Sequence, residues 1–399
     1  MRLPSIHKVK DFFPNHRKEY VSNFLLLSNS IFQAKSVNLS KCKKQVGILT
    51  QDSTVNVANV YTKFIRLFKM PNIGLFCIGI ALLILDLIKD LEENKLLIID
   101  RTNWKLGKVN DNILQMGIGL TNGIMIPLLG VPLIDKRGNS NVDERKGLLN
   151  LFLRFAPLLV GSYTIVGDRE FIGKEWFKHI LSLGHNFVIR LRSKDYKSII
   201  AEEINRTPEQ LEKRIRRSVR RNGYYFQSFE MDGNQMFLLV VKNKKNRKDP
   251  FVRLISNKEN IEEILADYDF RWSIEVYFRK TKTDGFNLED LRLTDPNKVF
   301  LMAVIVGFLY VKAIIAGLEE HTKKDVKKQY FKNRDKAYFR ESFFQTGMNI
   351  LSTCILNLSD WINSIQQRIH EINNKIFERF KDLKDKNIPT MLESIVKNV

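Results

Sequence analysis

Cysteine is scarce in this sequence, with three residues among 399: Cys42, Cys77 and Cys354. They lie far apart, form no CxxC pair and are odd in number, which argues against a disulfide framework and against the common zinc-binding spacings. The segment MRLPSIHKVKDFF also lacks the apolar stretch of a secretory signal peptide. We therefore expect a protein of the reducing cytoplasm.

Long apolar runs are also few. Residues 73–85 (IGLFCIGIALLIL) are too short to span a bilayer, which needs about 20 residues. Residues 299–318 are long enough, but they include Lys312. Basic polar segments flank both runs, and a large α/β protein needs fully buried helices, so we favour core helices and expect no membrane. A membrane-surface protein that uses residues 299–318 and the basic tail is the alternative.

Acidic residues are outnumbered, with 44 Asp and Glu against 65 Lys and Arg and a formal net charge of +21. Such a surplus favours a polyanionic partner, above all nucleic acid. A basic protein that binds no polyanion is the competing interpretation. Hydrophobic residues make up 44% of the chain, which excludes wholesale disorder.

Secondary-structure patterns change along the chain. Residues 1–90 are helical in pattern and basic, and we expect them to bind DNA. In residues 91–194, apolar strands end at Asp100 and Asp168, a hairpin turns at TNG, and NFVIRLRS forms a fifth strand. The order strand, strand, strand, helix, strand, helix, strand predicts a layered α/β fold.

The second half begins with an apparent insertion. Residues 195–257 contain the basic helix KRIRRSVRR (213–221), a hairpin that turns at DGN, and a strand at 251–256. The α/β core then resumes over residues 258–318 with a helix that begins near Lys258. Residues 319–399 are predicted to form a helical C-terminal region.

Three carboxylates form the candidate active site. Asp100 and Asp168 each follow an apolar strand, where a rigidly held side chain faces the crevice beyond a sheet. A single such acid is more typical of a helix cap or a turn. Glu275 lies on a basic helix at same-face offsets from Tyr268, Arg271 and Lys282. Three acids suit a site for two Mg²⁺ ions that act on phosphate, whereas the alternative is a solvated pair of Arg271 with Glu275.

These residues resemble a known family. Tyr268, Arg271, Glu275 and Lys282 match Y-x2-R-x3-E-x6-K, which resembles the YREK signature of insertion-sequence transposases with a DDE triad. IIDRTNWKLGK resembles that family's first aspartate block, and VGDREFIGKEW resembles the second. The three blocks occur in the family's order and span about half of the chain.

The resemblance implies a fold and an activity. It implies an RNase H-like core, with a mixed five-stranded sheet flanked by helices, a β-rich insertion at 195–257, and helical N- and C-terminal regions. Asp100, Asp168 and Glu275 would bind two Mg²⁺ ions, with Mn²⁺ as a substitute. The enzyme would cut DNA at terminal inverted repeats through a hairpin and join 3′-hydroxyls to target DNA. It would act in the bacterial nucleoid as a homodimer that synapses two ends, with 319–399 in the dimer contact.

Several cations and aromatic residues are candidate DNA contacts. The resemblance places Tyr268, Arg271 and Lys282 on the DNA backbone. Arg190 and Arg192 alternate on the fifth strand and should share one face, and Lys105 and Arg169 lie beside the acids. Arg169 has Glu170 or Glu175 as alternative partners. Hairpin-forming relatives stack an aromatic side chain, often tryptophan, on a flipped base, but no tryptophan lies between Trp176 and Trp272. The candidates for this role are Tyr224, Tyr225, Phe226, Phe237 and Trp272.

Two other functions compete with transposition. An RNase H-like nuclease would cut DNA without strand transfer, and the complete YREK spacing favours a transposase over it. An inactive, DNA-binding copy of a mobile element would need no acids. The presence of Asp100, Asp168 and Glu275 argues against such a copy.

Overall fold

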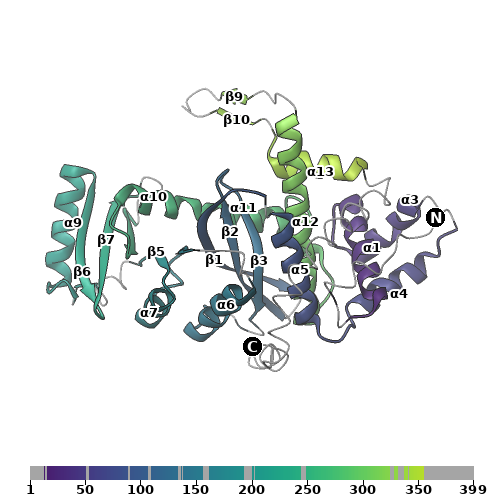
Figure 1. The fold of residues 1–399 in the computed structure, drawn as a ribbon, viewed down its shortest axis with the longest axis horizontal. Helices are drawn as coiled ribbons and strands as arrows, with labels where there is room; N and C mark the ends of the chain where they lie inside the picture. The colour runs from purple at the N-terminus through teal and green to yellow at the C-terminus, as the bar shows by residue number, and fades with distance from the viewer. Residues whose placement is uncertain are drawn as a thin grey trace.

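An eight-stranded sheet runs through the middle of the computed structural model (Figure 1), in the order β3-β2-β1-β4-β5-β8-β7-β6. The structure describes residues 13, 16–50, 54–88, 90–106, 109–133, 136, 138–155, 161–192, 200–201, 203–243, 249–323, 328–330, 337–339 and 341–354. The strands are β1 (Glu93–Leu106), β2 (Val109–Leu120), β3 (Met125–Pro132), β4 (Thr164–Gly167), β5 (Asn186–Arg190), β6 (Tyr224–Met231), β7 (Asn234–Lys242) and β8 (Phe251–Ser256).

The first five strands have the expected mixed topology. β1, β2 and β3 form an antiparallel meander, and β4 and β5 join it in parallel. Gly123 has a φ of 84° in the turn between β2 and β3, a conformation that glycine adopts without steric cost. The arrangement is a mixed α/β fold consistent with an RNase H-like domain.

The remaining three strands widen the same sheet. β8 pairs antiparallel with β5, followed by β7 and β6. Asp232 and Gly233 both have positive φ, as a two-residue type I′ hairpin turn requires. The five-stranded sheet that we expected is therefore too narrow, because the last residues of β5 offer a free edge with which β8 pairs.

Helices complete the fold. The N-terminal group comprises α1 (Lys18–Ala34), α2 (Leu39–Cys42), η2 (Lys43–Gln45), α3 (Val46–Thr50), α4 (Val57–Leu67) and α5 (Ile73–Leu87). The other helices are α6 (Val142–Phe155), α7 (Lys174–Ser182), α9 (Pro208–Asn222), α10 (Ile261–Phe270), α11 (Trp272–Lys282), η3 (Leu288–Asp290), α12 (Pro296–Lys323) and α13 (Phe343–Cys354). Every residue of β4 is buried, so both faces of the sheet are covered at its centre.

The long apolar helix α12 packs inside the protein. Among the described residues, 296–322 form one helix long and apolar enough to cross a membrane, but 72% of its most apolar stretch is buried. Leu301, Val306 and Leu309 are fully buried, and α12 contacts α5, α13 and β3. This burial is that of a core helix, as the sequence favoured.

The C-terminal region is not wholly helical. Two short antiparallel strands, β9 (Lys328–Tyr330) and β10 (Ala337–Phe339), lie between α12 and α13. Their aromatic residues favour extended backbone over helix, which corrects the all-helical expectation for this segment. The part of that prediction covering residues 355–399 lies outside the described residues.

One buried acid in the sheet gives a pH prediction. Asp111 on β2 is 4% exposed, its Oδ2 has no hydrogen bond from the described residues, and burial raises its pKa to about 6. Because the folded-state pKa is above the usual 3.8, the protein should lose stability as the pH rises from about 4 to 6. We expect Asp111→Asn to raise the free energy of unfolding by roughly 2–3 kcal/mol at pH 8 and hardly at pH 4.

Urea unfolding at both pH values measures this effect. Asp269→Asn, at an exposed position on α10, serves as the control and should change stability little at either pH. An equal gain for Asp111→Asn at pH 4 and pH 8 would mean that charge burial is not its cause.

Candidate active site

Asp100 lies within a strand, not at its end. β1 continues to Leu106 because β2 pairs with it as far as Leu106 and Val109. The prediction that the strand ends at Asp100 is therefore wrong. The parallel pairing of β1 with β4, however, does end just before Asp100, and its last pair is Ile99 with Gly167. Asp100 thus occupies the point where β1 loses one of its two neighbours.

Asp168 lies beside Asp100. It directly follows β4, as predicted, and the pairing of Ile99 with Gly167 makes the two aspartates the next residues on adjacent strands. The pKa of Asp100 is raised to about 6, chiefly by burial and also by the nearby charges of Asp168 and Glu170, while the Arg101 amide and Arg271 act to lower it. Two like charges held this closely favour a cation or a proton between them.

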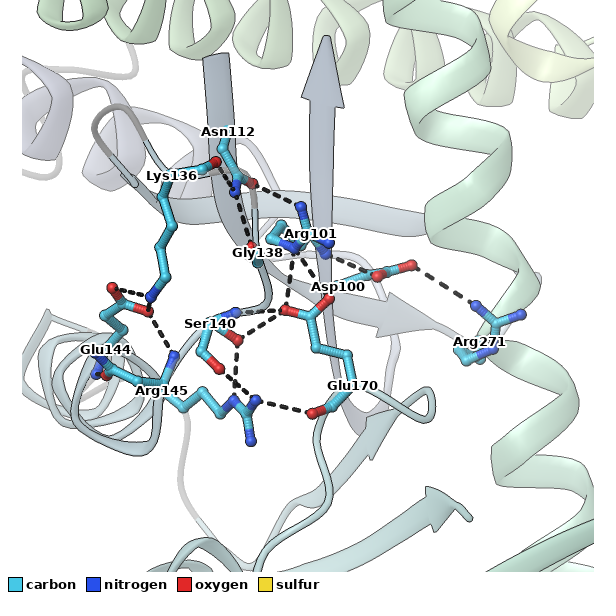
Figure 2. A network of polar contacts seen from close by, with 11 residues as sticks. Asp100, Arg101, Asn112, Lys136, Gly138, Ser140, Glu144, Arg145, Glu170 and Arg271 are labelled. Carbon is cyan, nitrogen blue, oxygen red and sulfur yellow. Dashed lines mark hydrogen bonds and ion pairs between the residues drawn. The ribbon is translucent and has the colours of Figure 1, made fainter. Parts of the chain in front are cut away.

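Arg271 connects the third acid to this pair. Its Nη1 lies 3.7 Å from Oδ2 of Asp100, and its Nη2 donates to Oε1 of Glu275 at 2.5 Å. Figure 2 shows the contact between Arg271 and Asp100 as a dashed line. The guanidinium therefore bridges two of the three predicted acids.

The helix that carries Arg271 is interrupted. A single helix was predicted, but α10 ends at Phe270 and α11 begins at Trp272. At the junction the backbone bonds tighten, because the Arg271 amide donates to Tyr268 and the Ile274 amide donates to Arg271, each three residues back. The same-face prediction still holds for Tyr268, Arg271 and Glu275, since Arg271 contacts both of the others.

Several polar atoms around Arg271 have no hydrogen bond within the described residues. They are Oδ1 of Asp168, Nε of Arg190, Oη of Tyr268 and Nε of Arg271. Burial opposes the charge of Arg271, but Tyr268, Asp168 and Glu275 together raise its pKa above the usual value. Buried polar atoms without partners are costly, so this group of atoms fits a site that takes a polar ligand.

Divalent metal ions are the ligands that the family implies, and the acids fit them in part. Asp100 and Asp168 offer adjacent carboxylates, and Oδ1 of Asp168, which accepts no hydrogen bond within the described residues, is the hard oxygen donor that Mg²⁺ prefers. Glu275 is directed to Arg271 instead. Across the described ranges, no three or more His, Cys, Asp or Glu side chains are gathered to hold a metal ion.

Two further predicted DNA contacts, Lys282 and Trp272, lie on α11 with Glu275. Lys282 donates from Nζ to the backbone oxygen of Asn103, 2.8 Å away, so it lies against β1 beyond Asp100. Burial lowers its pKa. Trp272 is 56% exposed, which makes it the most exposed of the large hydrophobic side chains described.

The other predicted cations are arranged around an acid that sequence reasoning missed. Asp249 lies 4.0 Å from Arg169, 3.6 Å from Arg190 and 3.1 Å from Arg253. Arg169 also lies 3.9 Å from Asp168, so the alternative partners proposed for it, Glu170 and Glu175, are wrong. Glu170 pairs with Arg101, and Glu175 pairs with Lys146.

Arg192 and Lys105 are the last two predicted DNA contacts. Arg192 does not alternate with Arg190 on the fifth strand as predicted, because β5 ends at Arg190. Lys105 pairs with Asn110 along β1, and its side chain lies outside what the structure describes.

The first five strands, in the order β3-β2-β1-β4-β5 with Asp100 on β1 and Asp168 directly after β4, form a mixed α/β fold consistent with the class of RNase H-like domains. Residues 92–312 match the family described as transposase DDE domain, and the chain belongs to that family. Members are transposases, enzymes of the nuclease and transferase type that act on DNA and generally use divalent metal ions. No curated protein matches the chain.

Proposed function

We propose that this protein is the transposase of a bacterial insertion sequence of the YREK group. Asp100, Asp168 and Glu275 would bind two Mg²⁺ ions, with Mn²⁺ as a substitute. One observation carries the proposal: Asp100 and Asp168 are neighbours on adjacent strands, and Arg271 connects Glu275 to the same site. Bound metal ions would supply Lewis acidity toward the phosphate and an activated water or 3′-hydroxyl.

The protein's own groups bind and orient the DNA. Arg271, Tyr268 and Lys282 would hold backbone phosphates beside the acids, with Arg169 and Arg190 on the side of the insertion. In the DNA-free structure Arg271 offsets the negative charges of Asp100 and Glu275. When a phosphate arrives, Arg271 has a further anion to pair with, and this exchange would release Glu275 toward the other two acids.

The inserted segment provides a further surface for DNA. α9 buries Leu211, Ile215 and Val219, while its cations lie on the other faces of the helix. Such a helix contacts phosphates without regard to sequence. For stacking on a flipped base in a hairpin step, we favour Trp272, at 56% exposure, over Tyr224, at 41%. The remaining candidates, Tyr225, Phe226 and Phe237, are buried or half-buried.

The remaining parts of the chain receive roles from the same proposal. Residues 1–90 would recognise the terminal inverted repeat, and residues 319–399 would contribute to a homodimer that synapses two ends. Target DNA would then receive the 3′-hydroxyls. The reaction would take place in the bacterial cytoplasm, at the nucleoid.

A cleavage assay tests the proposal. A labelled duplex that carries the element's own terminal repeat is incubated with the protein in Mg²⁺, in EDTA, and with Asp168→Asn. We expect a cut at the repeat's end that requires Mg²⁺ and disappears in the variant, with a hairpin among the products. Cleavage without joining to target DNA would favour a nuclease, and binding without cleavage would favour an inactive DNA-binding copy.

Lys282 gives a test of phosphate contact. We expect Lys282→Ala to weaken binding of end DNA and to reduce the slope of log affinity against log salt by about 0.9, the value for one phosphate contact. Electrophoretic mobility shifts at several salt concentrations measure the slope. Lys298→Ala, which removes a cation paired with Asp295 at the start of α12, is the control and should leave the slope unchanged. A weakened affinity with an unaltered slope would assign Lys282 to the structure of β1, through Asn103, and not to DNA.

A further inference from the structure

A buried ion pair lies immediately behind the two aspartates. Arg101 follows Asp100 on β1, and Glu170 lies two residues after Asp168. Nε of Arg101 is 3.1 Å from Oε1 and 3.0 Å from Oε2 of Glu170. Their side chains are only 15% and 12% exposed. The pair therefore joins the two segments that carry the acids.

The Glu170 side of this pair is anchored to a third segment. Oε1 of Glu170 accepts hydrogen bonds from the amide and the hydroxyl of Ser140, each at 2.9 Å. Arg145 on α6 donates to the Ser140 hydroxyl at 2.9 Å and to the backbone oxygen of Glu170 at 2.8 Å. Figure 2 shows Ser140 between Glu170 and Arg145. Glu170 is thus held by backbone and side-chain bonds at once.

The Arg101 side is anchored to β2 and the segment after β3. Nη1 of Arg101 donates to Oδ1 of Asn112 at 3.2 Å, and Nδ2 of Asn112 donates to the backbone oxygens of Lys136 and Gly138. Figure 2 shows Asn112 joined to Arg101 by one dashed line and to Lys136 and Gly138 by others. The guanidinium is therefore fixed from both sides.

The Arg101–Glu170 pair lies just beyond the end of the pairing between β1 and β4. The ladder between β1 and β4 ends at Ile99 and Gly167, one residue before each aspartate. Beyond that point no ladder bond sets how far Asp100 stands from Asp168, and the Arg101–Glu170 pair is the connection that follows. A buried ion pair is a poor source of stability, since apolar side chains of similar size often do as well or better. We therefore look for its role in holding the segment after β4 at a fixed distance from β1.

We propose that Arg101 and Glu170 are positioning residues that set the separation of the Asp100 and Asp168 carboxylates for metal binding. This inference rests on the proposed function of those two acids. Outer-shell groups of this kind typically change metal affinity or activity by about 10- to 100-fold. Because this pair acts through the backbone of two segments, we expect the lower end of that range.

The test uses Mn²⁺ as the probe and the full chain bound to end DNA. Mn²⁺ binding is measured by the loss of the free-ion paramagnetic resonance signal, for the parent protein, Glu170→Gln, Arg101→Gln and the double variant. Glutamine at position 170 keeps an oxygen that accepts from Ser140 but removes the ion pair. Glu175→Gln is the matched control, since it removes a neighbouring ion pair whose glutamate is 78% exposed. Thermal melting is recorded for every variant.

Support consists of an approximately tenfold weaker Mn²⁺ affinity in Glu170→Gln and in Arg101→Gln, with Glu175→Gln unchanged. Cleavage by Glu170→Gln should recover as Mn²⁺ is raised, because mass action overcomes weaker binding, and a folding defect would not respond in this way. The double variant should lose no more affinity than either single variant, since the two residues act as one pair.

Unchanged Mn²⁺ affinity in both single variants would overturn the inference, as would a loss that follows the fall in melting temperature across all variants. The failure of the proposed function looks different. In that case the parent protein itself neither binds Mn²⁺ in a manner that depends on Asp168 nor cuts the DNA.

Discussion

Glu275→Gln is expected to abolish cleavage of end DNA while leaving DNA binding and folding nearly intact. The substitution keeps the size of the side chain and its hydrogen bond from Arg271, but removes the charge that a divalent ion requires. Cleavage in Mg²⁺, mobility shifts with the same duplex and thermal melting measure the three quantities on one preparation.

The competing interpretation of Glu275 predicts a different result. If Glu275 only pairs with Arg271 one turn earlier on the helix, its loss should cost about 0.3–0.5 kcal/mol of stability and leave the rate of cleavage unchanged. Glu263→Gln is the matched control, because Glu263 is a 55% exposed acid on α10 that pairs with Lys258. It should cut DNA at the parent rate.

DNA binding decides what any loss of cleavage means. If Glu275→Gln loses binding and cleavage together while it melts normally, Glu275 contributes to DNA contact and the metal assignment is wrong for it. Because its neutralisation frees Arg271 from one carboxylate, binding at low salt should instead be equal to that of the parent protein or slightly tighter.

The strands and most helices were predictable because their patterns are local. The apolar runs before Asp100 and Asp168, the TNG and DGN turns, and the basic helix around Arg217 all appear as predicted. The end of β1 was not, because residues 101–106 are mostly polar and lack the apolar run that marks the strand before them, while pairing with β2 keeps them extended. The union of β5 with β8 likewise depends on an edge contact between segments that are distant in the sequence.

The site was easiest to predict where its residues lie close together in the sequence. Helical offsets brought Tyr268, Arg271 and Glu275 together correctly. The partners of Arg169 and Glu170 were missed, since adjacent charges in DRE suggest local pairs whereas the fold supplies Asp249 and Arg101. A sequence gives the types of the charged residues, but tertiary packing decides which of them meet.

The crossing of α12 and α13 gives the prediction with the largest expected loss of stability. A Cβ atom at Gly347 would lie 1.7 Å from the backbone oxygen of Ala313, and one at Gly317 would lie 1.9 Å from that of Phe343. Backbone atoms in packed helices yield little, so the helices must separate. We expect Gly347→Ala to lower the free energy of unfolding by about 1–3 kcal/mol, the range for overpacking.

Gly147 on α6 provides the control for this prediction. It is also a helical glycine, but a Cβ atom there would meet nothing within 4 Å. Alanine favours helix over glycine by about 1 kcal/mol, so Gly147→Ala should stabilise the protein by up to that amount, while the same substitution at Gly347 destabilises it. Urea unfolding followed by circular dichroism measures both. Equal, stabilising effects of the two substitutions would show that α13 does not pack on α12 as described. The stacking of Tyr310 on α12 with Phe344 on α13, at 5.4 Å between ring centroids, would then also be wrong.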